Sequence, residues 1–450
     1  MRNKGMTLVR VATRMTTVAG LVSCMWLGAV LPASADAVLH WDEIAVRTLT
    51  TQTPALSPFA QARFAAIVQL AVFEAVNATS REYNGYLGSA VAPAAAPIVA
   101  PVGASGDAAT IAAAHAVLVN YFQGSKAALD ADRDASLAAI PDGPAKTNGI
   151  ATGLAAAAAM IAERVGDGSS PVTSYVPPSP VPPGEWNITP GCPVDASGNP
   201  TGGILFNWQN IRPFGVPPPK SGDWLDKFLP PPPPEITSNI YAKAYNEVKR
   251  VGSVGSTERP DDRTTVVRFY AATSPTYLFH SVAQQLAEGS ANSLTTNARI
   301  LALISIATND SLVASFATKY HYLYWRPVTA IRAGDTDDNS KTEPDAGFTP
   351  LIVTPCFPSY PSNHASGSNG ALEVVRRFYG SAGFNLTLSA TIPVLGKVEL
   401  PYTSLQQISH DIDDARVYGG IHFRFDQDAG VKLGRTVATY VVQHNLLAPE

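Results

Sequence analysis

Two cations lie in an otherwise aromatic stretch near the C-terminal third of the chain. Lys319 and Arg326 flank the sequence Tyr-His-Tyr-Leu-Tyr-Trp, and Pro327 follows directly. Because this spacing corresponds to about two helical turns, we expect both side chains to project from one face of a helix. Pro327 is expected to end that helix and to leave Arg326 where a ligand can reach it. Two long cations in so apolar a stretch require an anion, either internal or bound.

A second segment combines prolines with serine and histidine. It runs Phe-Pro-Ser-Tyr-Pro-Ser-Asn-His and ends at His364. The prolines predict a turn, after which a helix is expected to begin near His364. A helix N-terminus presents unpaired N–H groups and a partial positive charge, which together favour an anion. Ser362 can cap this helix and donate a hydrogen bond to an oxyanion. Taken alone, His364 is a routine polar residue.

A third segment places a histidine and an aspartate one helical turn apart. Arg416 is followed by the pair Gly419 and Gly420, and then by His422 and Asp426. The two glycines are expected to break the helix and to let the backbone approach a ligand closely. The spacing predicts that Asp426 holds one ring nitrogen of His422 and so fixes its tautomer. A nucleophilic or ligating imidazole needs such a partner.

The three segments occur in a fixed order that is more informative than any one of them. They read K-x6-R-P, then P-S-x-H, then R-x5-H-x3-D, and span Lys319 to Asp426. This pattern resembles the superfamily of type 2 phosphatidic acid phosphatases and vanadium-dependent haloperoxidases. The proline-rich segment and the N-terminal helices look like those of its secreted bacterial haloperoxidase-like branch.

The resemblance implies a binding site for a tetrahedral oxyanion. Lys319, Arg326 and Arg416 would neutralise its equatorial oxygens, while Ser362 and the backbone N–H of Asn363 would add hydrogen bonds. The family usually has glycine where this chain has Asn363. The N–H survives that change, but the side chain can restrict the backbone angles or crowd the pocket.

The resemblance also assigns the acid–base and ligating groups. His422 would bond to the central atom, vanadium or phosphorus, Asp426 would orient it, and His364 would face the apical oxygen. With vanadate as cofactor, His422 stays a permanent ligand, and Lys319 polarises bound hydrogen peroxide for attack by a halide. With a phosphate monoester no cofactor is needed, since His422 attacks phosphorus and His364 protonates the leaving oxygen.

Two features favour halide oxidation over phosphate hydrolysis. Phe357 lies where, by resemblance, chloride oxidisers have phenylalanine and bromide oxidisers have histidine, so we assign it to a halide pocket. The context Trp325-Arg326-Pro327 also resembles the haloperoxidases more than the small acid phosphatases. A vanadate-dependent haloperoxidase acting on hydrogen peroxide, halide and a small organic acceptor is therefore our first hypothesis. A secreted acid phosphatase with a phosphohistidine intermediate and a non-catalytic oxyanion-binding protein are the alternatives.

The elements that must position these residues are helices. Heptad-like apolar spacing begins after the cap-and-proline pair Ser57 and Pro58, and no alternation of strands and helices appears. Further helices are expected over 107–122, 126–139, 145–165, 238–251, 262–287, 295–324, 365–379, 404–418 and 426–442. The fold class that follows is all-α, a large helical bundle.

The bundle is interrupted by a proline-rich segment over 171–237. Proline removes backbone donors and prevents regular helix, so this segment is expected to be irregular. Its interleaved aromatic residues favour packing against the helical body over a free linker. The expected organisation is thus a signal peptide (1–35), a helical scaffold (36–170), the proline-rich segment (171–237) and a catalytic helical domain (238–450).

The N-terminal region has the pattern of a secretory signal peptide. Four cations precede an apolar run over 18–30, which is followed by Ala33-Ser34-Ala35. The run is short for a membrane span, so no stable membrane anchor is expected, and the protein is expected to be secreted or periplasmic. Cys192 and Cys356 would remain after cleavage, and either a disulfide or two buried thiols fit the sequence.

Composition limits the class of partner. The chain of 450 residues carries 32 Lys and Arg against 36 Asp and Glu, and 46% of it is hydrophobic. So apolar a chain can bury a large core, and the absence of a basic excess argues against nucleic acid as a partner. A homodimer is left open.

Overall fold

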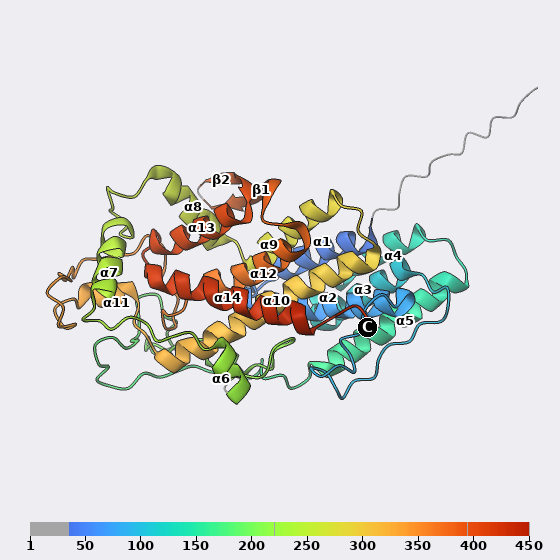
Figure 1. Cartoon of the computed structure of the whole chain (residues 1–450), viewed down its shortest axis with the longest axis horizontal. Coiled ribbons are helices and arrows are strands. Elements are labelled where there is room, and N and C mark those ends of the chain that lie inside the picture. Colours follow the sequence, from blue (N-terminus) through green and yellow to red (C-terminus); the bar gives the residue numbers. More distant parts are fainter. Residues whose placement is uncertain (1–35, 220, 394, 450) are drawn as a thin grey trace, which may run out of the picture. The chain divides into compact units, whose positions relative to one another are not determined.

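The computed structural model describes residues 36–219, 221–393 and 395–449. The predicted signal peptide and Cys24 lie outside the described residues. Asp36–Glu450 form one compact unit, and the domain boundaries expected at 170 and 237 fall within it and stay predictions. The all-α fold class is confirmed, since the described residues form fourteen α-helices and a single two-stranded sheet (Figure 1).

The elements follow one another along the chain as follows. They are α1 (Ala37–Thr50), α2 (Pro58–Ser80), α3 (Gly106–Tyr121), η1 (Gln123–Ser125), α4 (Lys126–Ala138), α5 (Pro144–Glu163), η2 (Phe206–Asn210), α6 (Gly222–Phe228), α7 (Asn239–Val251), α8 (Asp261–Ala272), α9 (Pro275–Glu288), α10 (Leu294–Tyr322), α11 (Pro327–Arg332), α12 (Asn363–Tyr379), β1 (Ala382–Ile392), β2 (Gly396–Ser404), α13 (Leu405–Val417) and α14 (Arg424–His444).

The centre of the bundle is α10, against which α2, α12 and α14 pack. Among the described residues, α2 and α10 have the length and apolar composition of a membrane span. The apolar stretch of α2 is 89% buried inside the protein and that of α10 is 100% buried. Core helices of large domains have this character, since every face of them meets another element.

The expected helices agree with the observed ones apart from a few local differences. One helix was expected over 262–287, but Ser274 caps a new helix there, with Pro275 in its first turn, so α8 and α9 are separate. The short helices α6 and α11 and the helix α1 were not predicted. The antiparallel hairpin of β1 and β2, in which Leu388 pairs with Leu400, was also missed.

The proline-rich segment packs against the bundle, as its aromatic residues suggested. Trp186, Trp208, Phe214 and Trp224 are all buried. The segment is mostly irregular, but η2 and α6 lie within it, so the expectation that proline excludes helix throughout was wrong.

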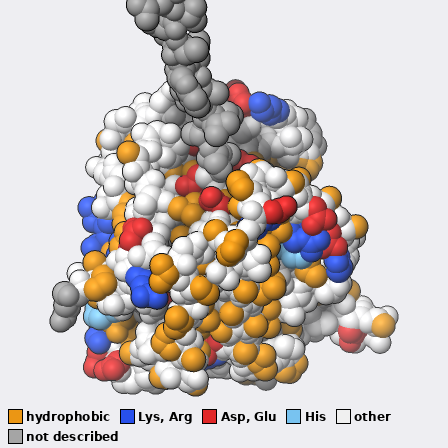
Figure 2. All heavy atoms as spheres, turned by 90° about the vertical axis from the view of Figure 1, so that its right-hand side faces the viewer, with side chains coloured by type: hydrophobic (Ala, Val, Ile, Leu, Met, Phe, Trp, Pro, Cys, Tyr) orange, Lys and Arg blue, Asp and Glu red, His pale blue; other side chains and the backbone are white. Residues whose placement is uncertain are grey.

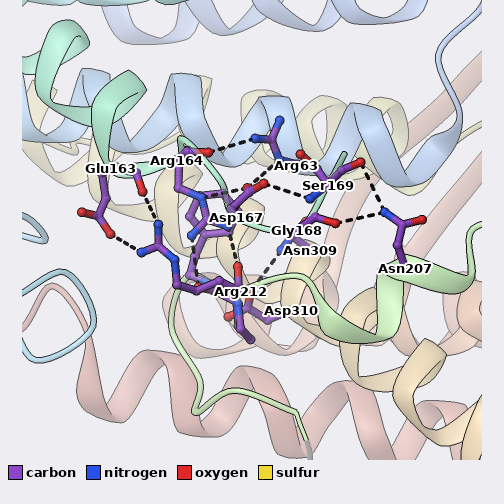
Figure 3. Close-up of polar contacts among 12 residues, drawn as sticks. Arg63, Glu163, Arg164, Asp167, Gly168, Ser169, Asn207, Arg212, Asn309 and Asp310 are labelled. Carbon is purple, nitrogen blue, oxygen red and sulfur yellow. Dashed lines mark hydrogen bonds and ion pairs between the residues drawn. The ribbon is translucent and has the colours of Figure 1, made fainter. Parts of the chain in front are cut away.

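Two buried carboxylates hold this segment in place (Figure 3). Asp310 of α10 accepts hydrogen bonds from the backbone N–H groups of Phe214 (2.9 Å), Gly215 (2.6 Å) and Val216 (3.2 Å). Asp167 binds Arg164, whose guanidinium also donates to the carbonyls of residues 212 and 213. Irregular backbone can be buried here because its polar groups have charged partners.

Close packing of α12 against α14 sets the geometry on which the site depends. A Cβ at Gly434 would overlap the carbonyl oxygen of Ser366, and a Cβ at Gly430 would overlap that of Ser362. The two helices can approach this closely only because both positions lack a side chain. As a result the backbone N–H of Ser362 donates to the carbonyl of Asp426 at 2.9 Å. The N-terminal ends of α12 and α14 are therefore fixed to each other.

Figure 2 shows the end of the molecule that carries α4 and α5, seen from the right of Figure 1. Hydrophobic side chains gather over the lower middle of this face, and charged side chains lie mostly toward its edges. The three segments that were expected to do chemistry belong to other elements, α10 to α14.

Candidate active site

Lys319 and Arg326 converge although they are not on one helix. The helix α10 ends at Tyr322, and Leu323 caps it in the left-handed conformation, with a φ of 50°. Arg326 is the N-cap of α11, and Pro327 is the first residue of that helix. The expectation of a shared helical face ended by Pro327 was therefore wrong. Proline is tolerated in the first helical turn, where its missing N–H has no partner to lose.

Lys319 binds the loop that precedes α12. Its Nζ donates to the carbonyl oxygens of Pro358 (2.8 Å), Ser359 (2.7 Å) and Pro361 (2.6 Å). Burial, and then the neighbouring Arg326 charge, lower the pKa of Lys319 well below its ordinary value. Three acceptors around one nitrogen nevertheless require three N–H groups, which only the protonated ammonium has. Lys319 therefore brings charge to the site, while its hydrogens hold the loop.

Arg326 is buried and only partly paired. Its Nε donates to the carbonyl of Phe357, and its Nη1 lies 2.8 Å from the carbonyl oxygen of Ile421 and 2.9 Å from Nε2 of His422. Its Nη2 has no hydrogen-bond partner within the part of the chain that the structure describes. Burial lowers the pKa of Arg326 to about 9, so the guanidinium is charged at neutral pH.

Arg416, in the last turn of α13, has the fewest partners. It is 4% exposed, and neither its Nε nor its Nη1 has a hydrogen-bond partner among the described residues. Burial lowers the pKa of Arg416 to about 10. A buried guanidinium without partners is costly unless an anion satisfies it.

His422 is held in one tautomer by Asp426, as the spacing predicted. Its Nδ1 lies 2.8 Å from Oδ2 of Asp426, while Arg326 faces Nε2. The carboxylate accepts at Nδ1 and the guanidinium donates at Nε2, so Nδ1 carries the hydrogen and Nε2 the lone pair. Burial, followed by the charges of Arg326, Lys319 and Arg416, lowers the pKa of His422 well below its ordinary value. The ring is neutral, and its Nε2 can bind an electrophilic centre if that bond replaces the hydrogen bond from Nη1 of Arg326.

Among the described residues, Asp426 is the one carboxylate whose charge raises the pKa of Lys319 and Arg326 against the effect of burial. Burial raises the pKa of Asp426 to about 6, against the opposing effects of its hydrogen bonds and of Lys319. At neutral pH it is ionised, so three buried cations face one buried carboxylate.

The N-terminus of α12 is built as expected. Ser362 is its N-cap and accepts from the backbone N–H of Ala365 at 3.3 Å. Asn363 begins the helix and does not have a positive φ, so its side chain imposes no backbone strain. His364 is half-buried. Burial, and then the charge of Arg416, lower the pKa of His364 well below its ordinary value, which leaves this imidazole neutral.

Phe357 covers two of the cations. Its ring centre lies 5.3 Å from Nζ of Lys319 and 5.0 Å from Cζ of Arg326, within the range of cation–π contact. The preceding residue, Cys356, forms a disulfide with Cys192, which decides between the two states that the sequence left open. The proline-rich segment is thus covalently joined to the loop that carries Phe357.

Gly419 and Gly420 follow the end of α13, so they break the helix as expected. A Cβ at Gly419 would overlap the carbonyl of Ala415, and one at Gly420 would overlap that of Gly252. Gly420 also has a φ of 79°, which favours glycine. The pair makes close contact with the protein's own backbone, and the close approach of a ligand stays a prediction.

Sequence reasoning missed Ser359 and the three carbonyls that hold Lys319. Ser359 lies in the second motif, the stretch Phe-Pro-Ser-Tyr-Pro-Ser-Asn-His that ends at His364, and its Oγ donates to Asp426 Oδ2 at 2.6 Å. Its place in that motif was the available signal. The carbonyl acceptors have no side-chain signature at all.

These residues fit a small tetrahedral oxyanion such as vanadate or phosphate. Unpartnered N–H groups of Arg326 and Arg416, an excess of buried positive charge and a neutral histidine converge near a helix N-terminus. A helical bundle with a site of this composition is what an oxyanion-binding protein requires.

Comparisons with known proteins find similarity to vanadium haloperoxidases. Residues 299–447 match the family model of the VCPO second helical-bundle domain. The vanadium chloroperoxidase of Curvularia inaequalis is 26% identical over 216 residues, which are 42% of this chain and 35% of that protein. The match thus spans about a third of the length of the curated relative.

Solved structures share the fold over most of the chain. A bacterial vanadium-dependent iodoperoxidase superposes with a TM-score of 0.70 at 23% identity, over 92% of this chain and 96% of its own. A holo-type bacterial vanadium-dependent chloroperoxidase gives a TM-score of 0.67 at 16% identity, over 90% and 96%. The matched domain and the shared fold support the vanadium haloperoxidase superfamily, which the three motifs indicated.

Proposed function

We propose that this protein is a vanadate-dependent haloperoxidase, which oxidises a halide with hydrogen peroxide at a vanadate held by His422. The observation that carries the proposal is a group of three buried cations that, among the residues described, has a single buried carboxylate nearby and leaves guanidinium N–H groups unpartnered. Such an arrangement is costly to fold, and a bound oxyanion would offset that cost.

Each group has a defined part in binding. Arg416 and Nη2 of Arg326 donate hydrogen bonds to oxyanion oxygens, and the N-terminus of α12 adds its N–H groups near Ser362. Nε2 of His422 supplies the lone pair for the central atom. When bound, vanadate would supply a Lewis acid that activates peroxide toward attack by halide.

His364 is suited to take a proton from hydrogen peroxide. Its imidazole is neutral, because burial and the charge of Arg416 lower its pKa, and a neutral imidazole nitrogen can accept a proton. The ring is half-buried, so it is within reach of solvent. Phe357 gives the site an apolar wall, which favours a weakly hydrated halide and excludes water.

Secretion or a periplasmic location is part of the same proposal. The Cys192–Cys356 disulfide supports it, since disulfides persist in oxidising compartments. Hydrogen peroxide, halide and a small organic acceptor would then meet the enzyme outside the cytoplasm.

The test compares two reactions on one preparation. Purified protein, loaded with orthovanadate or left free, is assayed for halogenation of a phenol with hydrogen peroxide and for hydrolysis of p-nitrophenyl phosphate. Halogenation that requires vanadate supports the proposal, whereas hydrolysis without halogenation would replace it with an acid phosphatase. Binding of both oxyanions without either reaction would leave an oxyanion-binding protein.

Two variants separate the site from the fold. His422→Ala is expected to abolish the activity and His410→Ala to keep it, because His410 is exposed and lies outside the site. Full turnover by His422→Ala would refute the site assignment.

A further inference from the structure

Ser359 links two halves of the site that come from different parts of the chain. Its side-chain Oγ donates to Oδ2 of Asp426 at 2.6 Å, and its carbonyl oxygen accepts from Nζ of Lys319 at 2.7 Å. Its backbone N–H donates to the carbonyl of Tyr324 at 2.8 Å, and the residue is fully buried. Both its main chain and its side chain are therefore held at fixed positions.

One carboxylate oxygen of Asp426 accepts three hydrogen bonds on the Nδ1 side of His422. Oδ2 of Asp426 accepts from Ser359, from Nδ1 of His422 at 2.8 Å and from the backbone N–H of Phe423 at 3.0 Å. Oδ1 of Asp426 has no hydrogen-bond partner among the described residues. The plane of the carboxylate is thus determined by these three donors alone.

Two of the three donors cannot fix the carboxylate relative to the rest of the site. His422 and Phe423 belong to the same short segment as Asp426, so they move with it. The terminal torsion of an aspartate is broad and does not define the plane by itself. Ser359 is the one donor that comes from the loop held by Lys319.

We propose that Ser359 is a positioning residue, which sets the ring of His422 relative to Lys319 through the Asp426 carboxylate. Hydrogen bonds run without interruption from Nζ of Lys319 to the Ser359 carbonyl, and from the Ser359 hydroxyl through Oδ2 to Nδ1 of His422. The ligating Nε2 is thereby aimed at the point where the cations meet. This inference rests on the proposed function, in which Nε2 binds vanadium.

Loss of the hydroxyl should affect two oxyanions differently. Vanadate needs a bond from Nε2 as well as the cations, so Ser359→Ala is expected to weaken its binding about 10- to 100-fold, as is typical of groups that orient a metal ligand. Phosphate is held by the cations and N–H groups without a bond to the ring. Its dissociation constant is expected to change less than about threefold, within the effect of one neutral hydrogen bond.

The experiment uses Ser359→Ala, Ser359→Thr and a matched control. Ser315→Ala removes another fully buried serine hydroxyl, which donates to the carbonyl of Leu312 within α10 at 3.0 Å. Dissociation constants for orthovanadate and phosphate are measured by calorimetry on the full chain. Retained phosphate binding shows that each variant is folded at the site.

A second readout does not depend on vanadate. Proton–nitrogen correlation spectra of protein labelled with ¹⁵N-histidine, without oxyanion, report the tautomer of His422, whose signals are assigned by their loss in His422→Ala. The wild type and Ser315→Ala should show one sharp Nδ1–H signal. Ser359→Ala should keep that tautomer, because Arg326 still donates at Nε2, but its Nδ1–H signal should be broadened and shifted as the carboxylate reorients. Ser359→Thr should recover the wild-type signal.

The outcomes separate the two proposals. Failure of the wild type to bind vanadate would count against the proposed function. Vanadate binding by the wild type with an unchanged constant in Ser359→Ala, or an equal loss in Ser315→Ala, would overturn the role of Ser359 and leave the function standing.

Discussion

The clearest consequence of the site is that Arg416 should reduce the stability of the free protein. Its side chain is 4% exposed, and two of its three guanidinium nitrogens, Nε and Nη1, have no hydrogen-bond partner in the described ranges 36–219, 221–393 and 395–449. Arg416→Met replaces the cation with an apolar side chain of similar length. We expect this variant to be more stable than the wild type and to lose oxyanion binding.

The size of the effect follows from the pKa. Burial lowers the pKa of Arg416 from 12.5 to about 10, and each unit corresponds to about 1.4 kcal/mol, so the charged form is disfavoured by about 3 kcal/mol. Because the pKa of a cation is lowered on folding, this penalty is complete at every pH below 10 and fades between pH 10 and 12.5. At pH 7 the free energy of unfolding of Arg416→Met should exceed that of the wild type by about 3 kcal/mol, which corresponds to about 3 °C in melting temperature for a chain of this length.

The assay is denaturant unfolding at pH 7 without phosphate, with Arg164→Met as the control. Arg164 is equally buried but is paired with Asp167 and with two carbonyls, so Arg164→Met should lower the free energy of unfolding by about 3 kcal/mol. Phosphate should raise the melting temperature of the wild type and leave that of Arg416→Met unchanged. A loss of stability in Arg416→Met as large as that in Arg164→Met would refute the reasoning, since it would mean that Arg416 has strong partners within the chain.

Three further predictions concern the framework. Burial raises the pKa of Glu74 to about 7 from 4.5, so its charged form is disfavoured in the folded state. Glu74→Gln should therefore leave the free energy of unfolding unchanged below pH 4.5 and raise it by up to about 3 kcal/mol above pH 7, as measured by denaturant unfolding across that range. Gly434→Ala should lower the free energy of unfolding by about 2 kcal/mol or more, because its Cβ would press on the carbonyl of Ser366 and separate α12 from α14. An unchanged melting temperature would contradict that packing. Replacing Cys192 and Cys356 together by serine removes a disulfide that spans 164 residues of the sequence. The free energy of unfolding should fall by about 2–4 kcal/mol, and phosphate binding should weaken. Neither effect is expected if the disulfide does not form.

The residues of the site were predictable because each motif is short. Asp426 lies one helical turn after His422, and local geometry alone brings them together. Ser362 precedes a helix and caps it for reasons that are equally local. Such features depend on a few residues and not on the rest of the fold.

The path of the chain between motifs was less predictable. Leu323 adopts a positive φ that a leucine rarely has, so nothing in the sequence indicated that α10 ends before Arg326. The Cys192–Cys356 pairing depends on how the proline-rich segment folds back onto the loop before α12, which spacing cannot reveal. The role of Ser359 depends on Asp426, 67 residues further along the chain.

The three cations contribute to the site in different ways, because they differ in how many of their N–H groups are already hydrogen-bonded within the protein. Lys319 donates all three N–H groups to loop carbonyls, so it can attract an oxyanion by charge but cannot donate a hydrogen bond to it without releasing the loop. Arg326 gives most of its own to Phe357, Ile421 and His422 and keeps Nη2. Arg416 keeps the most, so it is the main donor to the ligand. Removing Lys319 should therefore disorder the loop and destabilise the fold, whereas removing Arg416 should stabilise it, although both remove one positive charge from the same pocket.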